Sequence, residues 1–242
     1  MKSFGLGLPL FLALCLMGCA SGSGSGSGGD KVYYATGKGA VTPDGLHRIK
    51  WEPFAATFVK PGANLGNYDA VILEEVTISY QRPPRKNVMP GELNGLNDNF
   101  ALSSQATGYM KKYFHEAFVK ELAKSSDFKI VTEPGPNVLR IAGHIVGLVI
   151  TVPPQNQQLA DESVYSSSSG AMTLVLDADD SVTGEPLVRV GQRNDIGNGF
   201  DQFYESNPVE NSGAVRQVFD KWAMDLRQEL DQFKALKEVP AP

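Results

Sequence analysis

The two cysteines of this chain, Cys15 and Cys19, both lie close to its N-terminus, at the end of a short apolar run. The run follows the charged Lys2 and contains glycine and proline, and it is shorter than the roughly 20 apolar residues that a membrane-spanning helix needs. A charged start, an apolar centre and a small residue at the end are typical of a secretory signal peptide. Beyond Cys19 the sequence has no cysteine, so this part of the chain has to fold by burying apolar side chains, without a disulfide bond.

The four residues Leu16, Met17, Gly18 and Cys19 resemble the lipobox of bacterial lipoproteins. The resemblance implies that a peptidase recognises Leu16, Met17 and Gly18 and removes residues 1–18, and that Cys19 is acylated. Because Ala20 stands where an aspartate favours the inner membrane, it indicates the outer membrane, on the periplasmic face. The alternative is an ordinary signal peptide with two incidental cysteines.

The composition after the lipobox predicts three further segments. Residues 19–30 contain the lipidated cysteine and a Gly/Ser tether, which behaves as a flexible coil with a reach on the order of 20 Å. Residues 31–67 are dense in glycine and proline, and we expect an extended, partly ordered lead-in there. Residues 68–238 are long enough for one hydrophobic core, so we expect a single α/β domain and no second one.

Two segments have apolar residues at three- and four-residue spacing and therefore predict amphipathic helices. The first ends near Leu122 and begins at Ser103 or Ser104, either of which can cap a helix N-terminus. The second covers residues 211–236 close to the C-terminus. Its apolar face, which we expect to lie in the core, is formed by Val215, Val218, Phe219, Trp222, Leu226, Leu230 and Phe233.

The remaining regular pattern is that of strands, rich in branched and aromatic residues. In the long strand predicted over residues 138–152, Gly143 and Gly147 indicate bulges or close contacts. The other strands are predicted over residues 68–80 and 127–133 and as a pair within 171–193, with a turn near Thr183 and Gly184. The order predicts an α/β fold of the α+β type, a single domain with a mainly antiparallel sheet packed by an amphipathic helix and a long C-terminal helix.

The charge of the chain argues against a nucleic-acid partner. The formal net charge is −5 at pH 7, and no extended basic patch is available to displace counterions from phosphates. Motifs for phosphate loops, dinucleotide binding and nucleophilic serine hydrolases are also absent from the sequence. We therefore expect no enzyme, no catalytic residue and no cofactor.

Two stretches could be mistaken for metal sites. His115 and Glu116 begin a segment similar to a zinc-protease helix, but the second histidine is replaced by Val119, so we predict a solvated helix surface. The acidic run after residue 176 does not fit a calcium loop either, and a turn is the simpler interpretation. Its members are Asp177, Asp179, Asp180 and Glu185. We expect no metal site.

Three stretches resemble, in order and spacing, an uncharacterised proteobacterial lipoprotein family, the domain of unknown function 3313. They are NYDAVILEEV at 67–76, EPGPNVLRI at 133–141 and DSVTGEPL at 180–187. The resemblance covers residues from about 50 to 235, and it implies a lipid-anchored envelope protein. It implies no reaction and no catalytic residues.

These observations predict an outer-membrane lipoprotein with a non-enzymatic periplasmic domain that acts as an envelope accessory or adaptor protein. Its expected contacts are the membrane, through the N-terminal lipid, and an envelope protein partner. If the last turns of the C-terminal helix project beyond the sheet, Phe233 and Leu236 form a docking face for that partner. The alternatives are a carrier of a small hydrophobic ligand, held between sheet and helices, and an envelope hydrolase.

Overall fold

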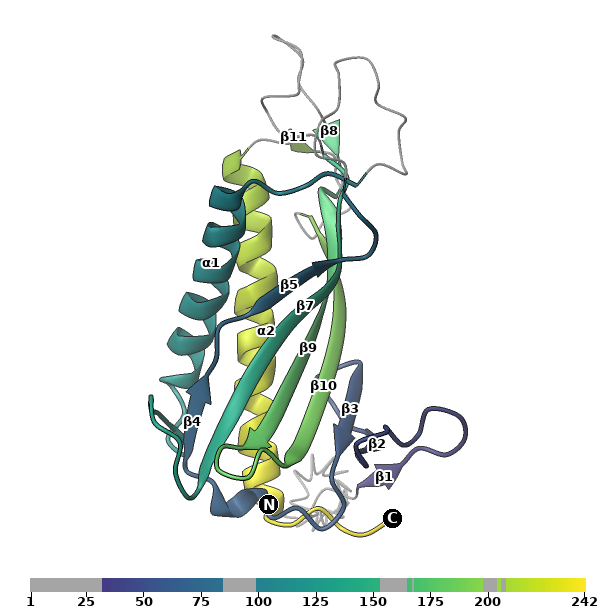
Figure 1. The fold of residues 1–242 in the computed structure, drawn as a ribbon, viewed down its shortest axis with the longest axis vertical. Helices are drawn as coiled ribbons and strands as arrows, with labels where there is room; N and C mark the ends of the chain where they lie inside the picture. Colours follow the sequence, from purple (N-terminus) through teal and green to yellow (C-terminus); the bar gives the residue numbers. More distant parts are fainter. Residues whose placement is uncertain (1–31, 85–98, 153–164, 167, 198–203, 206–207) are drawn as a thin grey trace, which may run out of the picture.

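The computed structural model describes residues 32–84, 99–152, 165–166, 168–197, 204–205 and 208–242. A twisted sheet forms one layer and two long helices form the other, so that the helices cover one face of the sheet (Figure 1). We refer to the second face, which no described helix covers, as the open face. No helix among the described residues has the length and apolar character to cross a membrane.

The elements follow one another in the order of their labels. The helices are η1 (Leu65–Asn67), α1 (Ser104–Leu122) and α2 (Pro208–Leu236). The strands of the first half are β1 (Tyr33–Tyr34), β2 (His47–Lys50), β3 (Ala56–Val59), β4 (Ala70–Leu73), β5 (Thr77–Tyr80) and β6 (Lys129–Ile130). Those of the second half are β7 (Val138–Ile150), β8 (Tyr165–Ser166), β9 (Gly170–Asp180), β10 (Pro186–Ile196) and β11 (Tyr204–Glu205).

Within the described residues nine strands form one sheet in the order β1-β2-β3-β10-β9-β7-β4-β6, with β5 also paired to β7. The pairs from β1 to β7 along this order are antiparallel. Strands β4 and β5 pair with β7 in parallel, and β6 pairs with β4 in parallel. The connection through α1 makes this possible, because parallel strands need a long crossover. The predicted fold class is confirmed: one α+β domain with a mainly antiparallel sheet and two helices.

The helices lie where their apolar faces predict. Ser103 caps α1, since its hydroxyl accepts a hydrogen bond from the Ala106 amide at 3.1 Å. The apolar face of α2 is buried against the sheet and against α1, with Trp222 and Phe219 fully inaccessible to solvent. The core is therefore a layer of aromatic and aliphatic side chains between the helices and the inner face of the sheet.

Two glycines of β7 have the roles that their positions predict. A Cβ on Gly143 would lie 2.6 Å from Cζ of Phe114, so α1 approaches the sheet closely at this point. Gly147 has φ +64° and lies where the register between β7 and β9 shifts, which identifies a bulge. The predictions of a close contact and a bulge are both confirmed.

The structure differs from the prediction for residues 31–67. Instead of an extended lead-in before the domain, this segment supplies three strands of the sheet and the short helix η1. Strand β3 pairs with β10 over four residues, and Leu46 and Val59 are fully buried. These strands are only two to four residues long, so they leave no clear alternating pattern in the sequence. The strand predicted over 68–80 is also divided, into β4 and β5.

The end of α2 packs against this first segment. Phe233 is 1% exposed, and its ring stacks on that of Trp51 at a centroid distance of 5.2 Å. The chain after α2 then continues along residues 62–66, where the Val239 amide donates to the Ala63 carbonyl oxygen at 2.9 Å. The expectation that Phe233 forms a docking face is therefore wrong, because Trp51, in the segment predicted as a lead-in, covers its ring.

Candidate functional site

A polar cleft is lined by residues that follow β3, precede β7 and connect β9 to β10. Its volume is about 270 Å³, close to the lower end of the range for small-molecule sites, which starts near about 300 Å³. We call it the asparagine cleft. Its lining residues are Lys60, Gly62, Ala63, Asn64, Asn67, Tyr68, Asn137, Asp180, Glu185 and Leu187.

Asp180 organises one wall of the asparagine cleft. One carboxylate oxygen, Oδ1, accepts hydrogen bonds from the Val182 amide at 3.0 Å and from the amide and hydroxyl of Thr183 at 2.7 and 3.0 Å. These bonds, led by the one from the Thr183 amide, hold the pKa of Asp180 below its usual value. Asp180 is therefore an ionised turn residue, as the turn interpretation of the acidic run predicts.

Tyr68 connects this wall to the helix layer. Its hydroxyl donates to Oδ2 of Asp180 at 2.9 Å, and its carbonyl oxygen accepts from Nζ of Lys234 on α2 at 2.6 Å. Burial, assisted by the neighbouring carboxylate, raises the pKa of Tyr68 to about 12. The phenol is therefore a proton donor, not a base, at any physiological pH.

The mouth of the asparagine cleft carries an ion pair and three amides. Nζ of Lys60 pairs with Oε1 of Glu185. Asn64, Asn67 and Asn137 are exposed, and among the described residues no hydrogen bond engages their side-chain amides. Asn137 has φ 64°, a left-handed conformation that asparagine tolerates better than most residues.

The three stretches that resemble the lipoprotein family meet at this cleft. The first contributes Asn67 and Tyr68, the second Asn137, and the third Asp180 and Glu185. Sequence reasoning recognised each stretch but assigned no site to them, because their order along the chain does not reveal that strand ends from three places share one edge. Their joint occurrence was the signal that could have pointed to a site.

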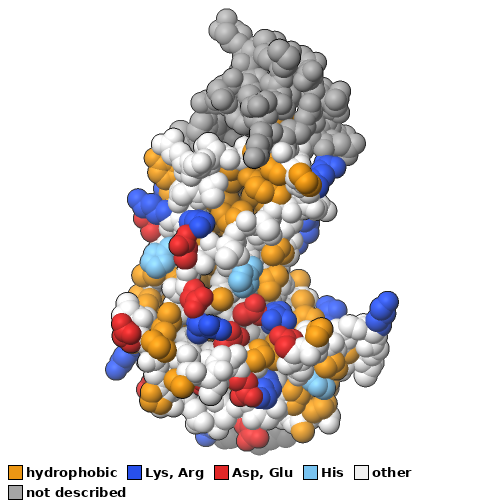
Figure 2. Space-filling model, viewed as in Figure 1, with side chains coloured by type: hydrophobic (Ala, Val, Ile, Leu, Met, Phe, Trp, Pro, Cys, Tyr) orange, Lys and Arg blue, Asp and Glu red, His pale blue; other side chains and the backbone are white. Residues whose placement is uncertain are grey.

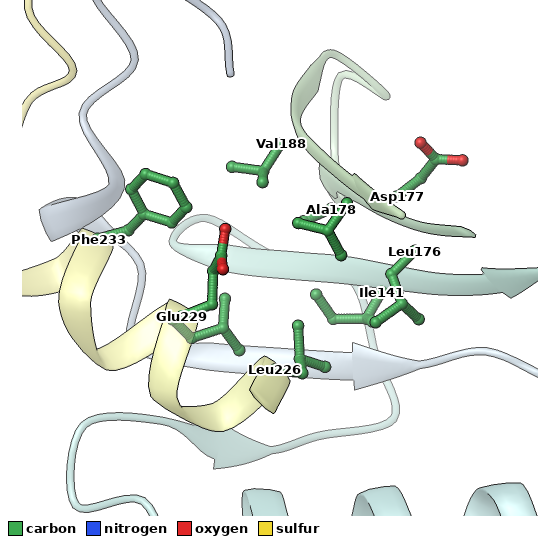
Figure 3. Close-up of a pocket in the computed structure, with 10 residues that line it drawn as sticks. Ile141, Leu176, Asp177, Ala178, Val188, Leu226, Glu229 and Phe233 are labelled. Carbon is green, nitrogen blue, oxygen red and sulfur yellow. The ribbon is translucent and has the colours of Figure 1, made fainter. Parts of the chain in front are cut away.

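A second cavity, of about 10 Å³, lies between α2 and the sheet (Figure 3). Glu229 points into it from α2, with Phe233 and Leu226 on either side. Glu229 is 1% exposed; its Oε1 accepts from the Thr57 hydroxyl at 3.1 Å, and its Oε2 has no partner among the described residues. Burial raises the pKa of Glu229 to about 8, and the nearby Asp225 adds to the shift. Glu229 is therefore mostly protonated near neutral pH.

The buried Glu229 predicts a pH-dependent stability. Because its folded-state pKa of about 8 exceeds the ordinary 4.5, the unfolded state loses the proton first. The contribution of Glu229 to the free energy of unfolding should therefore be largest below pH 4.5. It should fall as pH rises from 4.5 toward about 8. The slope for this group is roughly 1.4 kcal/mol per pH unit.

Urea unfolding across this pH window tests the prediction. Glu229→Gln keeps an acceptor for Thr57 and should remove most of the slope, whereas Glu116→Gln, at an exposed position of α1, should leave it unchanged. An equal slope in the original chain and in Glu229→Gln would contradict the assignment.

The open face carries a network of ion pairs, and acidic and basic side chains lie side by side on it (Figure 2). Arg140 on β7 binds Asp179 on β9 at 2.6 Å. Arg189 on β10 binds Asp177 on β9 at 2.5 Å and Asp44 at 3.0 Å. Two members of the acidic run are therefore cross-strand partners of arginines, which explains their presence on an exposed sheet.

One part of this network has the residue types of a nucleophilic triad. The Thr77 hydroxyl lies 2.8 Å from Nδ1 of His144, and Nε2 of His144 lies 3.5 Å from Oδ2 of Asp177. The second distance exceeds the roughly 2.6–3.2 Å that a base and its orienting carboxylate show. Thr77 and His144 also line neither of the two cavities described above. The arrangement is that of a hydrogen-bonded sheet surface.

The residues singled out in the sequence lie in different places. Leu16, Met17, Gly18 and Cys19, with the tether, lie outside the described residues. Leu236 is half-buried at the end of α2 and packs against the core. His115 is exposed on α1, as predicted for a solvated helix position.

Comparisons with known proteins place the chain in a family. The model of the family described as a protein of unknown function (DUF3313) matches residues 44–226. Among curated proteins, none matches the chain.

Several solved structures resemble the chain in part. A protein of the DUF330 family from Xanthomonas campestris has a TM-score of 0.40 and 11% identity, covering 71% of this chain and 87% of its own. For the PelC dodecamer from Paraburkholderia phytofirmans the TM-score is 0.35 and the identity 10%, covering 71% and 96%. For a candidate lipoprotein from Caulobacter crescentus the values are 0.28 and 13%, covering 72% and 92%. These similarities are too low to transfer a function.

Proposed function

We propose that the chain, which belongs to the DUF3313 family, is an outer-membrane lipoprotein whose periplasmic domain acts as an accessory or adaptor protein and not as an enzyme. The anchor is the set of acyl chains attached to Cys19, and the partner is another protein of the envelope. The observation that carries the proposal is the architecture itself: a two-layer domain that leaves one broad sheet face without a described helix over it (Figure 1).

The proposed anchor is connected to one particular end of the domain. The described chain starts at Val32, and the tether that precedes it has a reach of roughly 20 Å. Strand β1 follows at once, and the Tyr34 hydroxyl donates to the Pro240 carbonyl oxygen at 2.5 Å. The turn between β9 and β10, which helps to line the asparagine cleft, lies at this same end of the sheet (Figure 1). A lipid on Cys19 is therefore connected to the domain at this end, and the Gly/Ser tether lets the domain reorient so that the open face can meet a partner.

The open face has the mixed character of a protein-binding surface. The arginine and aspartate network lies on the part of this face near the start of β7 and the end of β9. Towards the other end of these two strands, outward-facing positions such as Val146 and Val175 are apolar and half-buried. Interfaces between proteins combine apolar and polar surface, and both occur on this face. We assign the partner contact to this face.

The two alternative functions fit the geometry less well. A carrier needs an enclosed volume of several hundred Å³, but the cavity between α2 and the sheet is about 10 Å³, near the space of one water molecule. A hydrolase needs converging titratable groups in a concave site, and the Thr77 and His144 pair lies on the sheet surface. Binding through a surface is therefore the better-supported mode.

Removal of the lipidated thiol tests the anchor. Cys19→Ser should move the protein from the membrane fraction to the soluble fraction, because several acyl chains supply the membrane affinity. Cys15→Ser is the matched control: it removes the other cysteine, which leaves with the signal peptide, and should stay in the membrane fraction. The measurement is fractionation followed by a density gradient. Release by Cys15→Ser, or retention of Cys19→Ser, would contradict the proposal.

Site-specific photo-crosslinking in cells tests the partner surface. A crosslinker at Val175 on the open face should capture a defined envelope protein. A crosslinker at Met224, which is 46% exposed on α2, should not capture it. Equal capture from both positions, or no capture from Val175, would contradict the proposal that the partner binds the open face.

A further inference from the structure

The asparagine cleft has a side-chain chemistry that its own fold does not use. The amides of Asn64, Asn67 and Asn137 make no hydrogen bond to other described residues, although each offers two donors and an acceptor. They come from the segment before η1, from η1 itself and from the turn before β7. Three amides from two stretches of the chain, 64–67 and the turn at Asn137, form a mixed array of donors and acceptors at one concave surface.

The backbone around the cleft is already paired. The Lys60 amide donates to the Leu187 carbonyl oxygen at 2.8 Å, and the Gly62 amide donates to that of Val239 at 2.9 Å. The Asn137 carbonyl oxygen accepts from the amides of Asp69 and Ala70. A peptide strand, which binds mainly through backbone pairing, would find these groups engaged. The cleft therefore favours a ligand that binds to side chains.

The charges at the cleft argue against an anion. Among the described lining residues, Lys60 is the one cation, and it pairs with Glu185. Asp180 adds a negative charge that three donors already satisfy on Oδ1. A phosphate or carboxylate would have to displace the Lys60 pair and approach Asp180. A neutral ligand meets neither obstacle.

We propose that the asparagine cleft binds a neutral saccharide that carries N-acetyl groups. Sugar hydroxyls both donate and accept, as the three asparagine amides do, and an acetamido group pairs with a primary amide through both of its polar atoms. Ala63 and Leu187 also line the cleft, but at 6% and 5% exposure they offer a sugar ring little apolar surface, so the asparagine amides carry the recognition. The volume of about 270 Å³ suits one or two sugar rings at the mouth.

The test uses the full chain with Cys19→Ser and nuclear magnetic resonance of its side-chain amides. The probes are di- and trisaccharides of N-acetylglucosamine, with cellobiose and inorganic phosphate as comparison ligands. We expect saturable shifts of the amide signals of Asn64, Asn67 and Asn137 with the N-acetylated probes at millimolar concentrations. Cellobiose should bind more weakly, and phosphate should produce no saturable shift at these signals.

Two variants make the test specific. Asn137→Gly removes the amide but keeps the left-handed backbone, and Asn67→Ala removes the amide of η1. Together they should weaken binding by roughly tenfold or more. Gln105→Ala, at an exposed position on α1, is the matched control and should leave binding unchanged. Unfolding curves show whether each variant keeps the fold.

Three outcomes would overturn the proposal: no shift with any saccharide, equal binding by the double variant, or a saturable response to phosphate in place of sugar. The measurement needs neither the anchor nor the protein partner. If the saccharides do not bind, the proposed adaptor function is unaffected. If the open face captures no partner, the proposed saccharide site is unaffected.

Discussion

Trp222→Ala is expected to lower the free energy of unfolding by about 3–5 kcal/mol, the range for removal of a large buried aromatic side chain. Trp222 has no solvent exposure and packs beside Phe219 at a ring-centroid distance of 5.8 Å. Its indole Nε1 also donates to Oδ1 of Asn194 on β10 at 2.9 Å. The substitution leaves a cavity and removes the donor that satisfies Asn194, so both contributions destabilise the fold.

Denaturant unfolding of matched variants separates these contributions. Met224→Ala, two residues away on α2 but 46% exposed, should change the free energy of unfolding by no more than about 0.5 kcal/mol. Trp222→Phe keeps most of the volume and loses only the hydrogen bond, so its cost should lie between the two. If Trp222→Ala cost less than about 1 kcal/mol, the placement of this face of α2 in the core would be wrong.

Gly143→Val should destabilise the domain by several kcal/mol, beyond the roughly 1–3 kcal/mol typical of overpacking, because the contact is between two rigid layers. Even the single Cβ of Gly143→Ala would lie 2.6 Å from Cζ and 3.1 Å from Cε1 of Phe114. The ring of Phe114 cannot withdraw easily, since Phe118 stacks on it at 4.1 Å and Phe219 meets it edge-on at 5.6 Å. A side chain at residue 143 therefore pushes α1 away from β7.

A double-mutant cycle identifies the cause of this loss. Phe114→Leu shortens the side chain that the new Cβ meets, so the cost of Gly143→Ala should be smaller in the Phe114→Leu background than in the original chain. Gly191→Ala on β10 is the control, because its Cβ would meet its nearest atom at 3.8 Å, an ordinary contact. Equal costs of Gly143→Ala in both backgrounds would show that the clash with Phe114 is not the reason.

Much of the fold was predictable because it rests on local patterns. The apolar face of α2 repeats at helical spacing, and its central residue Trp222 lies in the core as that spacing requires. The turn between β9 and β10 was predictable from Asp180 and Gly184, since both act on their own neighbouring backbone. The role of Gly143 followed from a missing side chain inside a long strand.

The candidate sites were not predictable in the same way, because they depend on contacts between distant residues. Glu229 looks like an ordinary polar position on a helix, and only its contact with Thr57, 172 residues away, reveals a buried carboxyl group. The helical spacing is compatible with Phe233 in the core or at an interface, and only the stacking of Trp51 on its ring decides between the two. The spacing of apolar residues along a helix does not show which strand will pack against a given turn of that helix.

The sequence by itself determined the segments that need only their own neighbours: the two amphipathic helices, the long strands, the turn at Asp180, and the lipobox that predicts an anchor at Cys19. The tertiary structure alone decided that the glycine-rich segment 31–67 joins the sheet, and that three strand ends meet to form the asparagine cleft. The physical reason is the range of the interactions. Backbone propensity and side-chain periodicity act over a few residues, whereas strand pairing and burial depend on which distant surfaces lie together in the folded chain.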